Sequence, residues 1–232
     1  MVIACRQGNL RQEQNPAYGL LRPIFTPAIN SSLSMDRTFM HHRNQKDTET
    51  WRIAVETCSA EFEQLSPGHR ARLLPMIRQA MACKEELNRL FGELDGGSVC
   101  ALCQGECCQT GRYHVTVVEL LSYLVTDREI FSPRFDTGSC PFLGDTGCLM
   151  EPAFRPYNCV TFLCDRLDGG LSAEQRIAFA ALSGQLLDSC RAIEALFANR
   201  FMSGILNNGD RYLAGKSAGI LWTISSSVEG PY

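Results

Sequence analysis

Cysteine is concentrated in one window of this chain, and the window restricts the possible folds and functions more than any other feature. Eight of the 12 cysteines lie between residues 100 and 164. A soft or borderline metal needs thiolates at such short spacings, because the chain between two ligands must curl until both sulfurs reach one centre. We therefore predict a metal site whose ligands are Cys100, Cys103, Cys107, Cys108, Cys140, Cys148, Cys159 and Cys164.

The first group of these cysteines is not expected to close a site alone. Cys107 and Cys108 are adjacent and therefore point in different directions. We expect Cys100 and Cys103 to share a centre with at least one cysteine from residues 140–164. We also expect the window to become ordered only with metal, because its loops show few periodic apolar residues and metal binding would have to supply the folding free energy there.

The complete pattern resembles a known family. The cysteines fall in the order C-x2-C-x3-C-C, C-P-F-L, G-C and R-P-x-x-C-x4-C. This order is similar to the YkgJ-like cysteine-cluster family, which is described as a zinc- or iron-chelating domain and to which flagellin lysine N-methylases are distantly related. The resemblance covers roughly residues 98–166, and it implies metal binding.

The identity of the metal stays open at this point. The spacing does not match the bacterial ferredoxin run C-x2-C-x2-C-x3-C-P or the cysteine groups of simple zinc ribbons. Eight thiolates can hold two zinc ions, or one four-iron four-sulfur cluster with four cysteines left over. Zinc and iron are therefore both retained as cofactors.

Two other polar residues lie within or beside the cysteine groups. His114 is close to the window and is an alternative ligand, but the thiolates suffice, so we favour the interpretation of a capped or solvated histidine. Arg155 is either a hydrogen-bond donor to the site or a structural ion-pair partner. His41 and His42 have no neighbouring third ligand and are interpreted as solvated residues.

Composition narrows the class of protein. The chain has 232 residues, of which 45% are hydrophobic and 20% charged, enough for one substantial core. A net charge of -3 gives no basic footprint for nucleic acid. No apolar run approaches the roughly 18–20 residues of a membrane helix, so we expect no membrane partner.

The expected location is the cytoplasm. The start of the chain, residues 1–6, shows no charged leader followed by an apolar segment. In a reducing compartment, clustered cysteines are more often metal-binding or catalytic than disulfide-bonded. The location therefore favours a metal site over a disulfide scaffold.

Helical periodicity outside the window predicts a mainly α fold. A helical hairpin is expected over residues 47–97 and a long helix over 171–202, each with an apolar stripe at 3.6-residue spacing. Cys58, Cys83 and Cys190 lie on these stripes and are interpreted as core residues. We expect the hairpin and the long helix to pack together, with the cysteine region forming an irregular metal-binding lobe at one end.

The remaining segments complete the predicted organisation. Residues 1–46 are interpreted as an extended or poorly ordered arm, and residues 47–232 as a single domain. Within it, 98–168 is the cysteine-cluster region and 203–232 a tail. Thr116-x-x-Glu119 is a capping box that predicts a short helix inside the window, and Asn207-Asn208-Gly209 is interpreted as a stop or turn.

Function is predicted in two classes. The first is a metal-binding module, for which a protein partner is left open. The second is an enzyme, either an iron–sulfur redox enzyme or a methylase-like protein-modification enzyme, although no other catalytic signature supports it. Thiol redox chemistry at Cys107 and Cys108 is a weaker variant. A P-loop is rejected for residues 209–217, because five residues separate the glycines where the motif has four.

Overall fold

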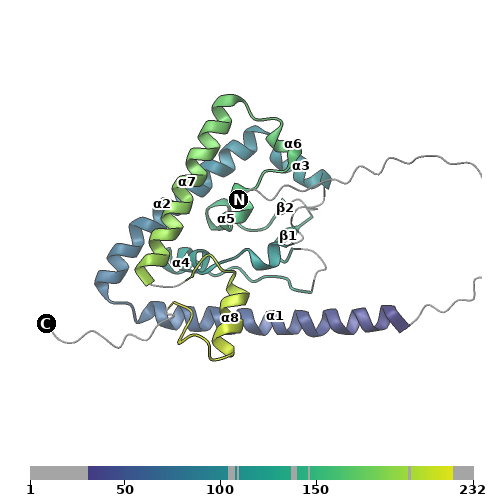
Figure 1. The fold of residues 1–232 in the computed structure, drawn as a ribbon, viewed down its shortest axis with the longest axis vertical. Helices are drawn as coiled ribbons and strands as arrows, with labels where there is room; N and C mark the ends of the chain where they lie inside the picture. Colours follow the sequence, from purple (N-terminus) through teal and green to yellow (C-terminus); the bar gives the residue numbers. More distant parts are fainter. Residues whose placement is uncertain are drawn as a thin grey trace, which may run out of the picture.

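The computed structural model describes residues 31–103, 108, 110–136, 140–145, 147–197 and 200–221, with side chains from residue 40 onward. The chain is mainly helical, as the sequence predicts. In Figure 1, α2 (Pro67–Glu93) and α7 (Ala173–Phe197) run side by side along one edge of a triangular outline, and α1 (Ser31–Glu63) forms its base. The cysteine region lies between them. Most of the predicted arm, residues 1–30, lies outside the described residues.

The first helix is longer than its apolar stripe indicates. Residues 31–46, predicted as part of an extended arm, are helical and continue without interruption to Glu63. The segment contains neither Gly nor Pro, so nothing in it breaks a helix. It also lacks an apolar stripe, which is why periodicity misses it. Polar contacts to other segments anchor its described side chains instead, as detailed below.

Helix α2, the second helix of the predicted hairpin, has a well-defined N-terminus. The Ser66 side chain accepts a hydrogen bond from the backbone N–H of His69, and Pro67 occupies the first turn, where its missing N–H costs nothing. Pro75 is accommodated inside the helix. The buried face of α2 packs along α7.

The three cysteines predicted to be core residues are buried. Cys58, Cys83 and Cys190 are 0%, 2% and 1% exposed. Cys83 of α2 and Cys190 of α7 lie in the same hydrophobic core. The packing of α1 differs in detail from the expectation, because α1 contacts α4 and α8 (Ile205–Leu213) more extensively than α7.

Helix α8 corrects the interpretation of Asn207-Asn208-Gly209 as a stop, because the helix runs through all three residues. The glycine serves close packing here. A Cβ at Gly209 would lie 2.6 Å from Cγ2 of Thr50, so α8 approaches α1 more closely than a larger residue would allow. The Glu61 carboxylate on α1 then accepts hydrogen bonds from the backbone N–H groups of Ile220 and Leu221, which docks the described end of the tail.

The cysteine region consists of short elements. They are α3 (Gly96–Cys103), the 3₁₀ turn η2 (Gly111–Tyr113), α4 (Val117–Val125), β1 (Leu143–Gly144), β2 (Gly147–Cys148), the 3₁₀ turn η3 (Pro152–Phe154), α5 (Tyr157–Thr161) and α6 (Asp165–Asp168). The two strands pair antiparallel, with Leu143 opposite Cys148.

This region shares the core with the long helices. Helix α4 is almost wholly buried, and Phe135, Phe142 and Phe154 belong to the same hydrophobic cluster as α2 and α7. Tyr123 of α4 stacks on Phe154 with ring centroids 4.1 Å apart. The cysteine region is therefore built around α4. The capping box starts this apolar helix, and the long helices cover it.

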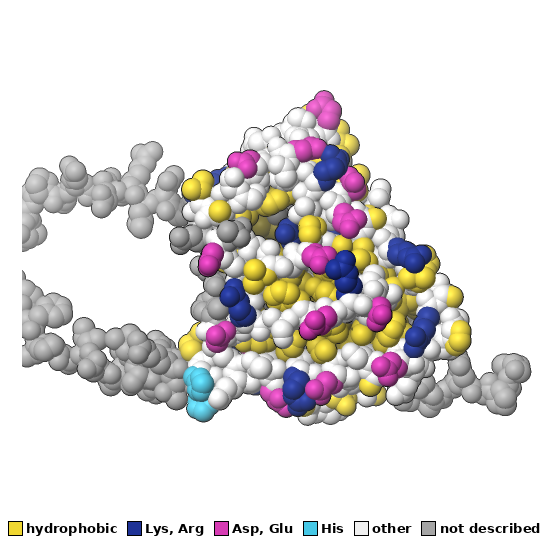
Figure 2. Space-filling model, turned by 180° about the vertical axis from the view of Figure 1, so that it is seen from behind, with side chains coloured by type: hydrophobic (Ala, Val, Ile, Leu, Met, Phe, Trp, Pro, Cys, Tyr) yellow, Lys and Arg dark blue, Asp and Glu magenta, His cyan; other side chains and the backbone are white. Residues whose placement is uncertain are grey.

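One face of the molecule shows no dominant charge feature among its described residues. On the face drawn in Figure 2, basic and acidic side chains are interspersed around apolar areas. Among the described helices, none is both long and apolar enough to cross a membrane.

Candidate functional site

A buried ion pair fixes the helix at the centre of the cysteine region. Nζ of Lys84 on α2 lies 2.6 Å from Oε1 of Glu119 on α4, and the two side chains are 0% and 1% exposed. The other carboxylate oxygen, Oε2, accepts hydrogen bonds from the backbone N–H and the hydroxyl of Thr116 at 2.8 and 2.7 Å. One carboxylate therefore caps α4 locally and joins it to α2.

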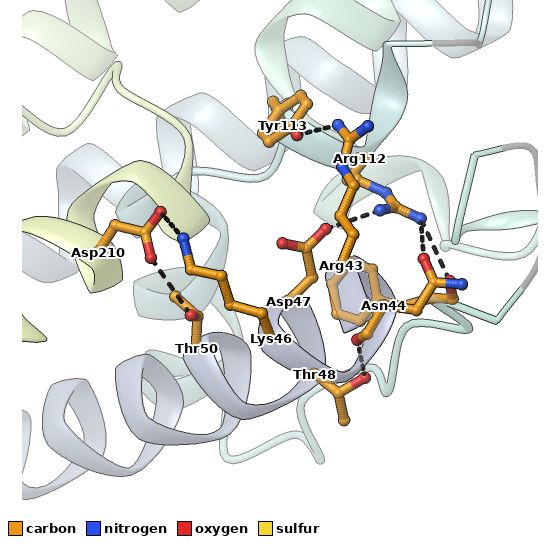
Figure 3. Close-up of polar contacts among 10 residues, drawn as sticks. Arg43, Asn44, Lys46, Asp47, Thr48, Thr50, Arg112, Tyr113 and Asp210 are labelled. Atoms are coloured by element: carbon orange, nitrogen blue, oxygen red, sulfur yellow. Dashed lines mark hydrogen bonds and ion pairs between the residues drawn. The ribbon is translucent and has the colours of Figure 1, made fainter. Parts of the chain in front are cut away.

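A second buried cation joins the η2 turn to α1. Arg112 forms an ion pair with Asp47 at 2.7 Å. Its guanidinium also donates to the Asn44 side chain at 2.9 Å and to the Phe135 carbonyl at 3.2 Å. Figure 3 shows Arg112 reaching Asp47 and Asn44, which project from one face of α1. The sequence offers no signal for this contact, because 65 residues separate Arg112 from Asp47.

Further contacts on the same face of α1 involve η2 and α8. The Tyr113 hydroxyl accepts a hydrogen bond from Arg43. Asp210 of α8 pairs with Lys46 at 2.9 Å and accepts a hydrogen bond from Thr50 (Figure 3). These contacts hold residues 43–50 of α1 against η2 and α8.

His114 lies directly beside a predicted metal ligand. Its Nδ1 is 3.3 Å from Sγ of Cys159, and its Nε2 is 3.2 Å from the hydroxyl of Thr110. Burial lowers the pKa of His114 below its usual value of 6.5. The interpretation of His114 as a capped or solvated residue missed the contact with Cys159, because 45 residues separate the two.

The pKa values of two predicted ligands from the second group are raised, mainly by burial. Burial raises the pKa of the Cys140 thiol, and nearby Cys148 raises it further, while the Phe142 N–H opposes them. Burial of the sulfur also raises the pKa of Cys159, with smaller contributions from Cys148 and Cys140. Although Cys159 as a residue is exposed, its sulfur lies 3.3 Å from Nδ1 of His114, and desolvation of the thiol by such neighbours raises its pKa.

The buried thiol of Cys140 packs tightly against η2. A Cβ at Gly111 would lie 2.4 Å from Sγ of Cys140. Only glycine leaves room for this sulfur, so the turn that precedes His114 is fitted to one of the predicted ligands.

The first cysteine group approaches the second through α3. This helix carries Cys100 and Cys103 and contacts β2, which contains Cys148, and α6, which is preceded by Cys164. Cys103 Sγ lies 3.5 Å from the Cys100 carbonyl. Cys108 packs against the core. Cys107 lies outside the described residues.

The structure brings these donors together without closing a site. Within the described parts of the chain, no group of three or more His, Cys, Asp or Glu side chains is gathered closely enough to hold a metal ion. The donor chemistry nevertheless suits zinc or iron–sulfur ligation, since thiols predominate and an imidazole accompanies them.

Arg155 has a structural role in this arrangement. Its guanidinium donates to the Met150 carbonyl at 3.0 Å and to the Asn88 side chain on α2 at 2.8 Å. Its charge also opposes the rise in the pKa of Cys159. Arg155 therefore links the loop before α5 to α2 and contributes positive potential near the thiols.

Comparisons with known proteins give no relative for this chain. No protein-family model, curated protein or solved structure matches it significantly.

Proposed function

We propose that this chain is a metal-binding protein that coordinates zinc or an iron–sulfur cluster through its cysteine window. The observation that carries the proposal is that Cys140 and Cys159, from separate segments, both lie against the η2 turn and the histidine that follows it: the Cys140 sulfur packs on Gly111, and the Cys159 sulfur lies 3.3 Å from Nδ1 of His114. Cys140 belongs to the hydrophobic core, but core packing does not account for Cys148 and Cys159, which are exposed. A cytoplasmic location belongs to the proposal, because a reducing compartment keeps such thiols available as ligands.

The remaining cysteines of the window complete the proposed ligand set. The contacts of α3 with β2 and α6 support a centre that draws on both groups. Bound zinc or an iron–sulfur cluster would supply a tetrathiolate cross-link between segments distant in the sequence. In the proposed complex, metal binding draws ligands from distant segments together, so metal affinity is coupled to local folding.

Anaerobic purification of the full chain followed by metal analysis tests the proposal. We expect either zinc in a colourless protein, or iron and sulfide in a brown one. Cys159→Ser should lower the metal content, whereas Cys58→Ala, a core control, should leave it unchanged. A full-length, folded protein that retains neither metal, and that takes up none on anaerobic reconstitution, would contradict the proposal.

A further inference from the structure

We propose that His114 is a metal ligand together with Cys159, which makes the centre a mixed imidazole–thiolate zinc site rather than an all-cysteine one. This inference rests on the proposed metal-binding function. It adds a ligand that the cysteine pattern does not contain, and it chooses between the two metals.

The distance between the two donor atoms fits a shared zinc ion. Zinc binds cysteine sulfur at about 2.3 Å and histidine nitrogen at about 2.0–2.1 Å, and a tetrahedral angle between those bonds places the donors about 3.5 Å apart. Nδ1 of His114 lies 3.3 Å from Sγ of Cys159. A small outward adjustment of either side chain therefore gives the separation that a tetrahedral centre requires.

The second ring nitrogen of His114 has the partner that a metal-bound histidine needs. Such histidines usually donate their other N–H to an oxygen atom, which fixes the tautomer and the ring orientation. Nε2 of His114 lies 3.2 Å from the Thr110 hydroxyl. In the tautomer with hydrogen on Nε2, Thr110 accepts this bond, and the lone pair of Nδ1 points toward Cys159.

His114 is held firmly in this position. Two residues before it, Arg112 is fixed to α1 by the Asp47 ion pair. Two residues after it, Thr116 binds the Glu119 carboxylate, which Lys84 holds on α2. The imidazole therefore has supports on both sides, as a preorganised ligand requires.

Thiols from the same region are the candidates for the remaining positions. The Cys140 sulfur packs against Gly111, three residues before His114, and Cys148 lies in β2, paired with Leu143 three residues after Cys140. Together with His114 and Cys159, these two thiols give a Cys₃His set, which is a common structural zinc site, whereas a four-iron four-sulfur cluster is typically held by four cysteines. The mixed set therefore favours zinc.

Zinc K-edge X-ray absorption and chelator competition on the full chain test this assignment. For the zinc-loaded wild type we expect one nitrogen scatterer at about 2.0–2.1 Å beside sulfur at about 2.3 Å. His114→Ala should remove the nitrogen scatterer. It should also lower zinc affinity by more than the roughly 10–100-fold that loss of an outer-shell partner causes. His114→Cys should restore affinity with an all-sulfur spectrum.

Two further variants separate ligation from indirect effects. Thr110→Val should weaken zinc binding about 10–100-fold while keeping the nitrogen scatterer, because it removes only the partner of Nε2. His41→Ala, at an exposed histidine of α1, should change neither measurement.

The outcomes distinguish this inference from the proposed function. A zinc protein with an all-sulfur spectrum, or with unchanged affinity in His114→Ala, overturns the His114 assignment and leaves metal binding intact. Iron with sulfide in the native protein does the same. A chain that binds neither zinc nor iron overturns both proposals.

Discussion

The buried pair of Lys84 and Glu119 gives the sharpest test of how the cysteine region is held. Replacing Lys84 by Met keeps the apolar part of the side chain but leaves the Glu119 carboxylate buried without its cation. Removing one partner of a buried ion pair typically costs about 3–5 kcal/mol. Glu119 keeps two hydrogen bonds from Thr116, so we expect about 3 kcal/mol, the lower end of that range.

The reverse replacement should cost more. Glu119→Leu leaves the Lys84 ammonium buried with no carboxylate, and it also removes half of the capping box, whose loss contributes about 1 kcal/mol. We therefore expect about 4–6 kcal/mol for this single variant. The double variant Lys84→Met/Glu119→Leu buries no charge, so it should be less destabilised than the sum of the single variants by several kcal/mol.

Chemical denaturation of the full chain, followed by circular dichroism, measures these differences. Arg89→Met provides a matched control, because Arg89 lies on the same helix but pairs with exposed Glu86 and Glu93. Its unfolding midpoint should not move measurably. Effects below about 1 kcal/mol for Lys84→Met, or single-variant costs that simply add in the double variant, would show that the pair is not desolvated.

Other contacts give three further predictions. Arg112→Met should lower the free energy of unfolding by about 3 kcal/mol, because it leaves the buried Asp47 carboxylate on α1 without its cation. A loss no larger than that caused by replacing an exposed arginine would contradict this. Gly209→Ala should cost about 1–3 kcal/mol by thermal melting, since its Cβ would press on Thr50, and unchanged melting would refute that close packing. Burial raises the pKa of Glu61 above 4.5 despite its backbone hydrogen bonds, so the fold favours the protonated carboxyl. The stabilisation from protonated Glu61 is full below about pH 4.5 and is lost as pH rises through the folded-state pKa. On acidification, wild type should therefore gain stability relative to Glu61→Gln. Parallel profiles of stability against pH for the two proteins would contradict this.

Features encoded by neighbouring residues could be predicted from the sequence. The stripe containing Cys83 and the capping box of Thr116 and Glu119 both operate over a few residues, and the structure confirms the burial of the first and the hydrogen bonds of the second. Each signal reflects local geometry, namely the helical repeat or the unsatisfied N–H groups of a first turn.

Features that depend on distant partners could not be predicted in this way. The polar half of α1 has no apolar stripe, and its contacts with Arg112 and Asp210 become visible only in three dimensions. Gly209 has the sequence signature of a stop, but here it allows two helices to approach closely. The contact of His114 with Cys159 likewise depends on how α5 packs. The metal-site prediction for the eight cysteines remains a prediction.

For the proposed metal site, the supports of the candidate ligands indicate which of them would move on binding. His114 is fixed by its neighbours on both sides, and Cys159 lies in α5, which packs on α2 and α7. Cys148, in contrast, is exposed and belongs to a ladder of only two residues per strand, so little energy opposes its displacement. Because the His114–Cys159 pair has supports independent of metal, chelation should loosen the β1–β2 turn and α3 before it disturbs that pair. Local stability, rather than cysteine spacing alone, then determines the order in which the ligands assemble.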